Sequence, residues 1–171
     1  VVKCFRKMAR PTDNVCGDDL TWSFDEATGL LTVTGSGDMH DYIVYDENYK
    51  HISVAPWGEL PVKAVSLPLG LTSIGEGAFR DCVGLTEVTI PATVTRLGEY
   101  AFSGCTGLKE VILPDSVVDL SGQWVFQGCS SLEYVRIPDH IEFMGISFFA
   151  GCTALEEKAR SKARLKARSK A

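Results

Sequence analysis

The chain has 171 residues, of which 45% are hydrophobic, and a formal net charge of −5. Its length suits one modest globular domain, and no run of ~20 apolar residues is present that would span a membrane. The charge is divided unevenly: residues 158–171 hold seven lysines and arginines and no acid, which leaves a net charge of −12 on residues 1–157. An acidic body of this kind argues against nucleic acid as its partner.

The N-terminal part divides into an extension, residues 1–15, and a segment, residues 16–58, that we expect to contain a β-hairpin. The extension is mixed and basic, without the apolar core of a signal peptide. Apolar and polar residues alternate in 20–24 and again in 31–34, which is the period of a half-buried strand. The short segment 25–29 joins the two runs, as expected for a hairpin.

Carboxylates and tyrosines crowd residues 38–47. Oxygen ligands are abundant enough here for calcium to be conceivable, but the spacing matches no known calcium-binding loop. A solvated loop is therefore the favoured interpretation, and an enzyme or metal site in this segment is a remote alternative. His40, His51 and His140 are isolated in sequence, with no nucleophile motif around them. We expect no catalytic residue, no metal site and no cofactor, and hence a protein that is not an enzyme.

A repeated unit occupies residues 59–157. Four phenylalanines, 23, 24 and 23 residues apart, are each followed by a cysteine three positions later and a leucine six positions later, and each is preceded by a proline. A fixed period of this size predicts a solenoid, in which each unit buries its apolar face against its neighbours. The members are Phe79, Phe102, Phe126 and Phe149, with Cys82, Cys105, Cys129 and Cys152, Leu85, Leu108, Leu132 and Leu155, and Pro68, Pro91, Pro114 and Pro138.

Each of the four units of 23–24 residues predicts a strand, a turn, a short helical piece and a return. In the second unit, Val88 and Ile90 have the period of two of a strand with one buried face, and Pro91 ends that strand. Residues 99–102 are compatible with a helix, so the expected class is an α/β solenoid. The third unit has one extra residue, which we place in the loop at 120–124.

The pattern Ile-Pro-x-x-Val-Thr-x-x-Gly-x-x-Ala-Phe-x-x-Cys-x-x-Leu resembles the BspA-like leucine-rich repeats, over roughly residues 62–157. The resemblance implies a right-handed superhelix with a parallel sheet on one face and short helices or turns on the other. It also extends to Cys16-Gly17, Trp22 and Leu31-Thr32, and so favours an N-terminal β-hairpin cap, with Trp57 covering the edge of the core. It implies a cell-surface protein, often adhesive, and it carries no catalytic residues.

The four repeat cysteines are expected to form a ladder of buried, reduced thiols. Equivalent residues of adjacent coils lie about 4.7–4.9 Å apart, but their side chains point the same way and do not converge as a disulfide requires. Buried cysteine behaves as a small hydrophobe. Cys4 and Cys16 lie outside the ladder, where they could pair with each other or remain free.

The surface that could bind a partner is the outer face of the strands, whose polar positions form three columns across the coils. Ile112, Tyr134 and Arg136 cluster toward the C-terminal half, and Tyr and Arg are enriched at binding hot spots. The columns are Lys63, Thr86, Lys109 and Glu133; Ala64, Glu87, Glu110 and Tyr134; and Ser66, Thr89, Ile112 and Arg136. We expect a non-enzymatic binding module for an unidentified protein or glycan. The alternative is a structural fragment of a longer repeat protein with no ligand of its own.

The basic, low-complexity tail 158–171 departs from the repeat pattern. Lys158 takes a position that should be apolar, so the array reads as cut off inside its last strand. With no apolar stripe and strong self-repulsion, the tail should lack a stable fold alone. A solvated tail is favoured, although it could contact an acidic partner, nucleic acid or an anionic membrane.

Overall fold

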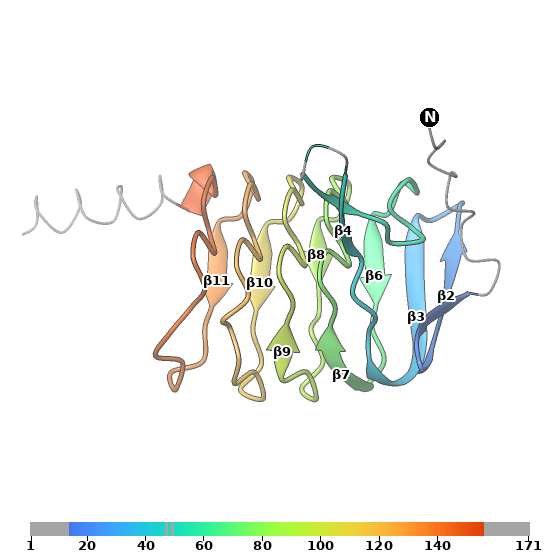
Figure 1. Ribbon diagram of the computed structural model, residues 1–171, viewed down its shortest axis with the longest axis horizontal. Helices are drawn as coiled ribbons and strands as arrows, with labels where there is room; N and C mark the ends of the chain where they lie inside the picture. The colour runs from blue at the N-terminus through green and yellow to red at the C-terminus, as the bar shows by residue number, and fades with distance from the viewer. Residues whose placement is uncertain (1–13, 47, 49, 156–171) are drawn as a thin grey trace, which may run out of the picture.

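The computed structural model describes residues 14–46, 48 and 50–155, in which successive coils stack along one axis (Figure 1). The extension 1–13 and the tail from 156 onward lie outside the described residues, and so does Cys4. The strands are β1 (Val15–Gly17), β2 (Asp19–Asp25), β3 (Leu30–Asp38), β4 (Ile43–Tyr45), β5 (His51–Ser53), β6 (Ala64–Ser66), β7 (Gly70–Ile74), β8 (Glu87–Val88), β9 (Arg96–Leu97), β10 (Glu110–Ile112) and β11 (Tyr134–Arg136).

The main sheet has the strand order β1-β2-β3-β6-β8-β10-β11. β2 and β3 are antiparallel, which confirms the hairpin predicted from the alternating pattern. Its turn is stabilised by the Asp25 carboxylate, which accepts hydrogen bonds from the Ala27 amide and the Thr28 hydroxyl. β3 then pairs with β6 in parallel, and the pairs β6–β8, β8–β10 and β10–β11 are parallel too. The hairpin therefore lies at the N-terminal end of the stack.

A second ladder was not expected from the sequence. The first residues of β3 pair with β6, whereas its last residues pair with β7, and β7 pairs with β9. Gly35, between the two ladders, and Gly37, within the second, have φ angles of 108° and 98°. A side chain on Gly35 would collide with the Asp19 carbonyl oxygen, so only glycine fits there. One long strand thus starts both faces of the solenoid.

The expected short helices are wrong for the described coils, where only residues 153–155 are helical. The segments around the repeat phenylalanines are turns. Alternate amides bond to the next coil, and those between them bond to a carbonyl three residues back, so they do not form the bonds to a carbonyl four residues back that define an α-helix. Phe79 donates to Ala101, and Phe102 donates to Val125, both backbone to backbone. The described repeats are accordingly built from strands and turns, in a sheet of mixed parallel and antiparallel pairs.

A column of stacked aromatic rings runs through the core. Phe79, Phe102 and Phe126 are fully buried, with ring centroids 5.3 and 5.4 Å apart. Trp57 stacks on Phe79 at 5.8 Å and Phe149 stacks on Phe126 at 5.8 Å, so the column extends one coil each way. The Trp57 indole donates to the Ala78 carbonyl at 2.6 Å. Both the 23–24-residue register and the prediction that Trp57 covers the core edge are confirmed.

The extra residue of the third unit is Ser121. Leu120 is buried at the position that Leu97 fills one coil earlier, and Gly122 follows where Gly98 should follow directly. The Asp119 carboxylate accepts a hydrogen bond from the Ser121 amide at 2.9 Å, so the insertion has a partner within its own loop. This placement agrees with the expected loop.

The residue two positions before each repeat phenylalanine has left-handed backbone geometry. Gly77, Tyr100, Trp124 and Ser147 occupy it in successive coils, with φ angles of 63°, 55°, 55° and 54°. A side chain in this region costs about 1–2 kcal/mol. The Tyr100 and Trp124 rings stack on each other at 5.0 Å, which offsets part of that cost. Ser147 is exposed and has no aromatic ring to stack.

Ser147→Gly should therefore stabilise the protein by about 0.5–1 kcal/mol, the steric relief less the greater backbone entropy of glycine. Urea unfolding followed by circular dichroism measures this change. Ser130→Gly is the matched control, because Ser130 is also an exposed turn residue but is not among the residues with positive φ. That control should destabilise slightly. A loss of stability in Ser147→Gly would contradict the interpretation.

Candidate binding face

The register of the parallel strands places the predicted columns side by side on one face. Ala64, Glu87, Glu110 and Tyr134 are aligned across β6, β8, β10 and β11, and Ile112 is aligned with Arg136. The eleven residues of the candidate surface are all exposed; we call them the sheet face. They are Lys63, Ser66, Thr86, Glu87, Thr89, Lys109, Glu110, Ile112, Glu133, Tyr134 and Arg136.

Two apolar side chains stand out on the sheet face. Ile112 is 51% exposed and Tyr134 is 49% exposed, on neighbouring strands and in diagonal positions. Earlier coils carry Ser66 and Thr89 in the Ile112 column, and Ala64 and two glutamates in the Tyr134 column, so the large apolar side chains of this face lie in its C-terminal half. Exposed aromatic and aliphatic side chains on a rigid sheet are suited to burial by a partner.

The Arg136 side chain is less available than the sequence suggested. Its guanidinium donates to the Leu113 carbonyl at 3.0 Å and to the Asp115 carboxylate at 2.8 Å. Both groups belong to the turn after β10, so the side chain lies along the edge of the face. This pair is exposed and adds little to stability, but it fixes where the positive charge lies.

The sheet face carries both signs of charge and does not form a pocket. Glu87 and Glu110 are directly in register, where like charges repel, while Lys63 and Lys109 lie in the neighbouring column. Two surface hollows, of about 390 and 140 Å³, are lined by residues outside the sheet face. A face of this shape suits a macromolecule better than a small ligand, which needs a concave site.

The acidic segment does not gather its carboxylates around one point. Asp41 accepts the Glu76 amide at 2.8 Å, Asp38 accepts the Thr72 hydroxyl at 2.6 Å, and Asp46 closes its own turn. The Thr72 hydrogen bond holds the pKa of Asp38 below its usual value. No group of three metal-binding side chains is found in the described part of the chain, from which residue 47 is missing. The carboxylates of Asp38 and Asp41 attach the segment to the first coils, and that of Asp46 stabilises the turn of the segment itself.

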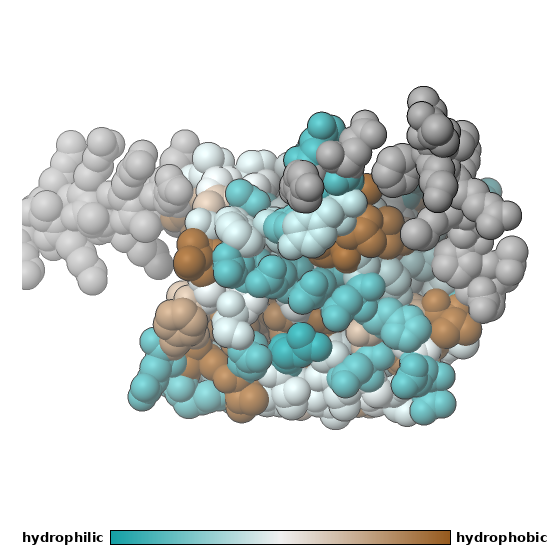
Figure 2. Space-filling model, viewed as in Figure 1, coloured by the Kyte–Doolittle hydropathy of each residue, from teal (hydrophilic) through white to brown (hydrophobic). Residues whose placement is uncertain are grey.

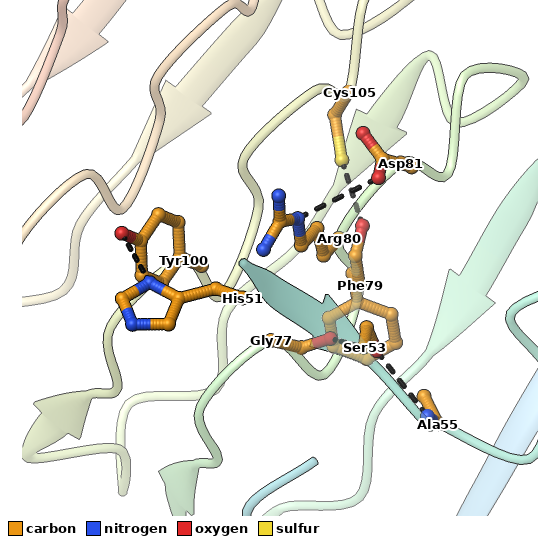
Figure 3. A network of polar contacts seen from close by, with 9 residues as sticks. All are labelled: His51, Ser53, Ala55, Gly77, Phe79, Arg80, Asp81, Tyr100 and Cys105. Carbon is orange, nitrogen blue, oxygen red and sulfur yellow. Dashed lines mark hydrogen bonds and ion pairs between the residues drawn. The ribbon is translucent and has the colours of Figure 1, made fainter. Parts of the chain in front are cut away.

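Part of this segment forms a second hairpin, which was not expected from the sequence. β4 and β5 pair and lie over the turns of the coils, where the Ser53 hydroxyl donates to the Gly77 carbonyl (Figure 3). The His51 ring lies against Tyr100, with 2.6 Å between its Nδ1 and the phenol oxygen. The Arg80 guanidinium lies over the face of the Tyr100 ring, with 4.9 Å between its Cζ and the ring centroid. Because these contacts join residues far apart in sequence, no local sequence motif predicts them.

The cysteine ladder is buried, as predicted. Cys82, Cys105, Cys129 and Cys152 form no disulfide, and three of them donate a hydrogen bond to the phenylalanine carbonyl of the preceding coil. Burial raises the pKa of the Cys82 thiol to about 12, with a smaller contribution from Asp81. Burial also raises the pKa of the fifth free thiol, Cys16, to about 11.

These five thiols should not react with Ellman's reagent in the native protein at neutral pH, because the reactive thiolate is both suppressed and inaccessible. All five should react within minutes once the protein is unfolded in guanidinium chloride. Mass spectrometry of peptides after brief iodoacetamide labelling assigns the sites. Cys82, which is 6% exposed, should be the first of the ladder to react. Rapid native labelling of Cys105 or Cys129 would refute the buried ladder.

The chain belongs to the family described as the BspA type leucine-rich repeat region (6 copies), whose family model matches residues 43–163. It is similar in structure to a leucine-rich repeat protein from Bacteroides ovatus, with a TM-score of 0.51 and 21% identity over 83% of this chain and 46% of the other. It is also similar to one from Eubacterium ventriosum, with a TM-score of 0.52 and 24% identity over 72% of this chain and 39% of the other. The chain spans less than half of either relative. No curated protein sequence matches it.

Family membership bears on the expected function. Repeats of this family generally form protein-binding or surface modules, and they are generally not enzymes. Across residues 14–46, 48 and 50–155, no helix has the length and apolar character needed to cross a membrane.

Proposed function

We propose that the protein is a non-enzymatic recognition module of a cell surface that binds a protein or a glycan through the C-terminal half of the sheet face. One observation carries the proposal: Ile112 and Tyr134 are each about half exposed on adjacent strands, where earlier coils place smaller or charged side chains. The backbone beneath them is fixed by parallel pairing on β10 and β11. A partner would therefore bury apolar area without ordering the scaffold first, which lowers the entropic cost of binding.

The other parts of the chain are proposed to support this face. The β2–β3 hairpin caps the first coil of a right-handed superhelix, a role favoured by the pairing of β3 with β6 and by the edge contact of Trp22 with Trp57 at 5.6 Å. The division into extension 1–15, cap and loop 16–58, repeats 59–157 and basic tail 158–171 follows this assignment. The basic tail adds a charge that could attract an acidic partner.

The test is a binding screen in which surface variants are compared. Purified wild-type protein and the double variant Ile112→Thr/Tyr134→Ala are probed against panels of purified extracellular proteins and of glycans. Each replacement restores the kind of residue found in the same column of an earlier coil. Val83→Thr is the matched control, because Val83 is 61% exposed but follows Cys82 outside the sheet face.

A ligand that binds wild type and Val83→Thr but loses about ten-fold or more in affinity for the double variant supports the proposal. Equal binding by all three proteins assigns recognition to another surface. Absence of binding across both panels favours the alternative, a structural piece of a longer repeat protein. Circular dichroism of each variant checks that the fold is retained.

A further inference from the structure

The last coil carries a second exposed apolar surface, away from the sheet face. Phe143 is 69% exposed, Met144 is 36% exposed and Ile146 is 66% exposed; we call these three residues the terminal patch. Figure 2 shows hydrophobic surface gathered over the last coils, at the lower left of the molecule. Contiguous exposed apolar residues on a protein surface mark interaction sites more often than chance placement would.

The terminal patch includes outward positions that are polar in the preceding coils. The carbonyls of Glu99, Gln123 and Ile146 accept equivalent hydrogen bonds, from the amides of Gly77, Tyr100 and Trp124. Ile146 therefore replaces the glutamate and the glutamine of two earlier coils. In the same way, Phe143 occupies the position that Asp119 and Arg96 occupy in the two preceding coils. Asp119 and Arg96 are paired by a backbone β-bridge that continues the second ladder.

A further coil stacked on the last one would not bury this surface completely. Arg96, Glu99 and Asp119 have a coil on each side, yet they remain partly exposed, because they point outward from the solenoid. Met144 is different, because Leu97 and Leu120 at its position are buried in the core. A following coil would cover Met144 but would leave Phe143 and Ile146 available.

The charge around the terminal patch selects its partner. Glu142 adjoins Phe143 in sequence and Asp139 lies on the same coil, whereas Asp119, the neighbour of Phe143 on the second ladder, has Arg96 beside it. Residues 137–155 contain no lysine or arginine, and the nearest arginine in sequence, Arg136, is paired with Asp115. Two copies meeting patch to patch would bring carboxylates against carboxylates, which disfavours a symmetric dimer.

We propose that the terminal patch is a docking site for a partner polypeptide segment that carries both apolar side chains and lysine or arginine. The apolar side chains cover Phe143 and Ile146, and the basic side chains lie against the carboxylates beside them. This surface is independent of Ile112 and Tyr134, so either binding function can exist without the other.

The test uses a short fluorescent peptide of lysine and leucine as the probe, with the full chain titrated in by fluorescence anisotropy. Two control peptides match it: lysine with serine, of equal charge, and glutamate with leucine, of equal apolar content. The variant Phe143→Ser/Ile146→Gln removes the patch. Leu69→Ser is the matched control, because Leu69 is 82% exposed at the other end of the repeats.

Saturable binding of the lysine–leucine peptide that falls about ten-fold or more in the double variant, and is unchanged in Leu69→Ser, is the expected result. Equal affinity for the lysine–serine peptide would reduce the effect to charge alone and overturn the proposal, as would undiminished binding to the double variant. Two further outcomes also overturn it. One is concentration-dependent dimerisation of wild type that the double variant abolishes. The other is about a ten-fold gain in affinity on deleting residues 158–171, which would assign the patch to the chain's own tail.

Discussion

Replacing Phe102 by alanine should destabilise the protein by about 3–5 kcal/mol. The Phe102 ring is fully buried and stacks on Phe79 at 5.3 Å and on Phe126 at 5.4 Å. Truncation removes the contacts of two coils at once and leaves a cavity at the middle of the aromatic column. Because domains of this size are stable by only about 5–15 kcal/mol, such a loss is a large fraction of the total stability. Urea denaturation followed by fluorescence and circular dichroism measures it.

Two further variants show whether the loss reflects position in the stack. Glu87→Ala should change stability by no more than about 0.5 kcal/mol, since Glu87 is exposed and its neighbour in register is Glu110. Phe149→Ala should give an intermediate loss, because the Phe149 ring is half-buried and has a column neighbour on one side. Equal effects of Phe102→Ala and Glu87→Ala would show that the inward and outward assignments are wrong.

The repeat register made the core predictable. Side chains spaced at 23 or 24 residues must stack when coils repeat, so the aromatic column and the buried cysteines follow from spacing alone. The alternation around Val88 and Val111 likewise predicted which side chains of the strands face solvent. That prediction required no knowledge of a partner.

Contacts between different kinds of element were not predictable in this way. Residues 99–102 are compatible with a helix, but the amides of Tyr100 and Phe102 bond to the following coil, and this non-local pairing overrides local propensity. The β4–β5 hairpin docks through His51 and Tyr100, which are 49 residues apart. The pairing of Arg136 with Asp115 also depends on how one turn is placed beside the next strand.

The second large effect expected is a loss of stability in mild alkali. The thiols of Cys16 and Cys82 have pKa values raised by burial to about 11 and about 12, and burial also raises the pKa of Cys105. The pKa of Cys129 is raised as well, first by a hydrogen bond with Cys152 and then by burial. In the unfolded chain all four titrate near their ordinary value of about 8.5.

The free energy of unfolding depends on pH because the folded state holds the thiol protons more tightly than the unfolded state does. Above pH ~8.5 the unfolded thiols release protons that the folded thiols keep, so the free energy of unfolding falls as pH rises. Below that pH both states are protonated and stability is independent of these groups. One pH unit above it, each thiol costs about 1.4 kcal/mol, so the four together cost on the order of 6 kcal/mol.

Urea unfolding under reducing conditions, repeated from pH 7 to pH 10, should therefore show constant stability up to pH ~8.5 and a steep fall beyond it. Tyr42, whose pKa is raised by burial and whose hydroxyl donates to the Cys16 carbonyl, adds to the fall only above its ordinary pKa of about 10. Cys82→Ala is the matched variant, because it removes one titrating thiol and should reduce the slope by about one proton. A stability that stays constant from pH 7 to pH 10 would mean that the thiols ionise freely in the folded protein, and the buried ladder would have to be abandoned.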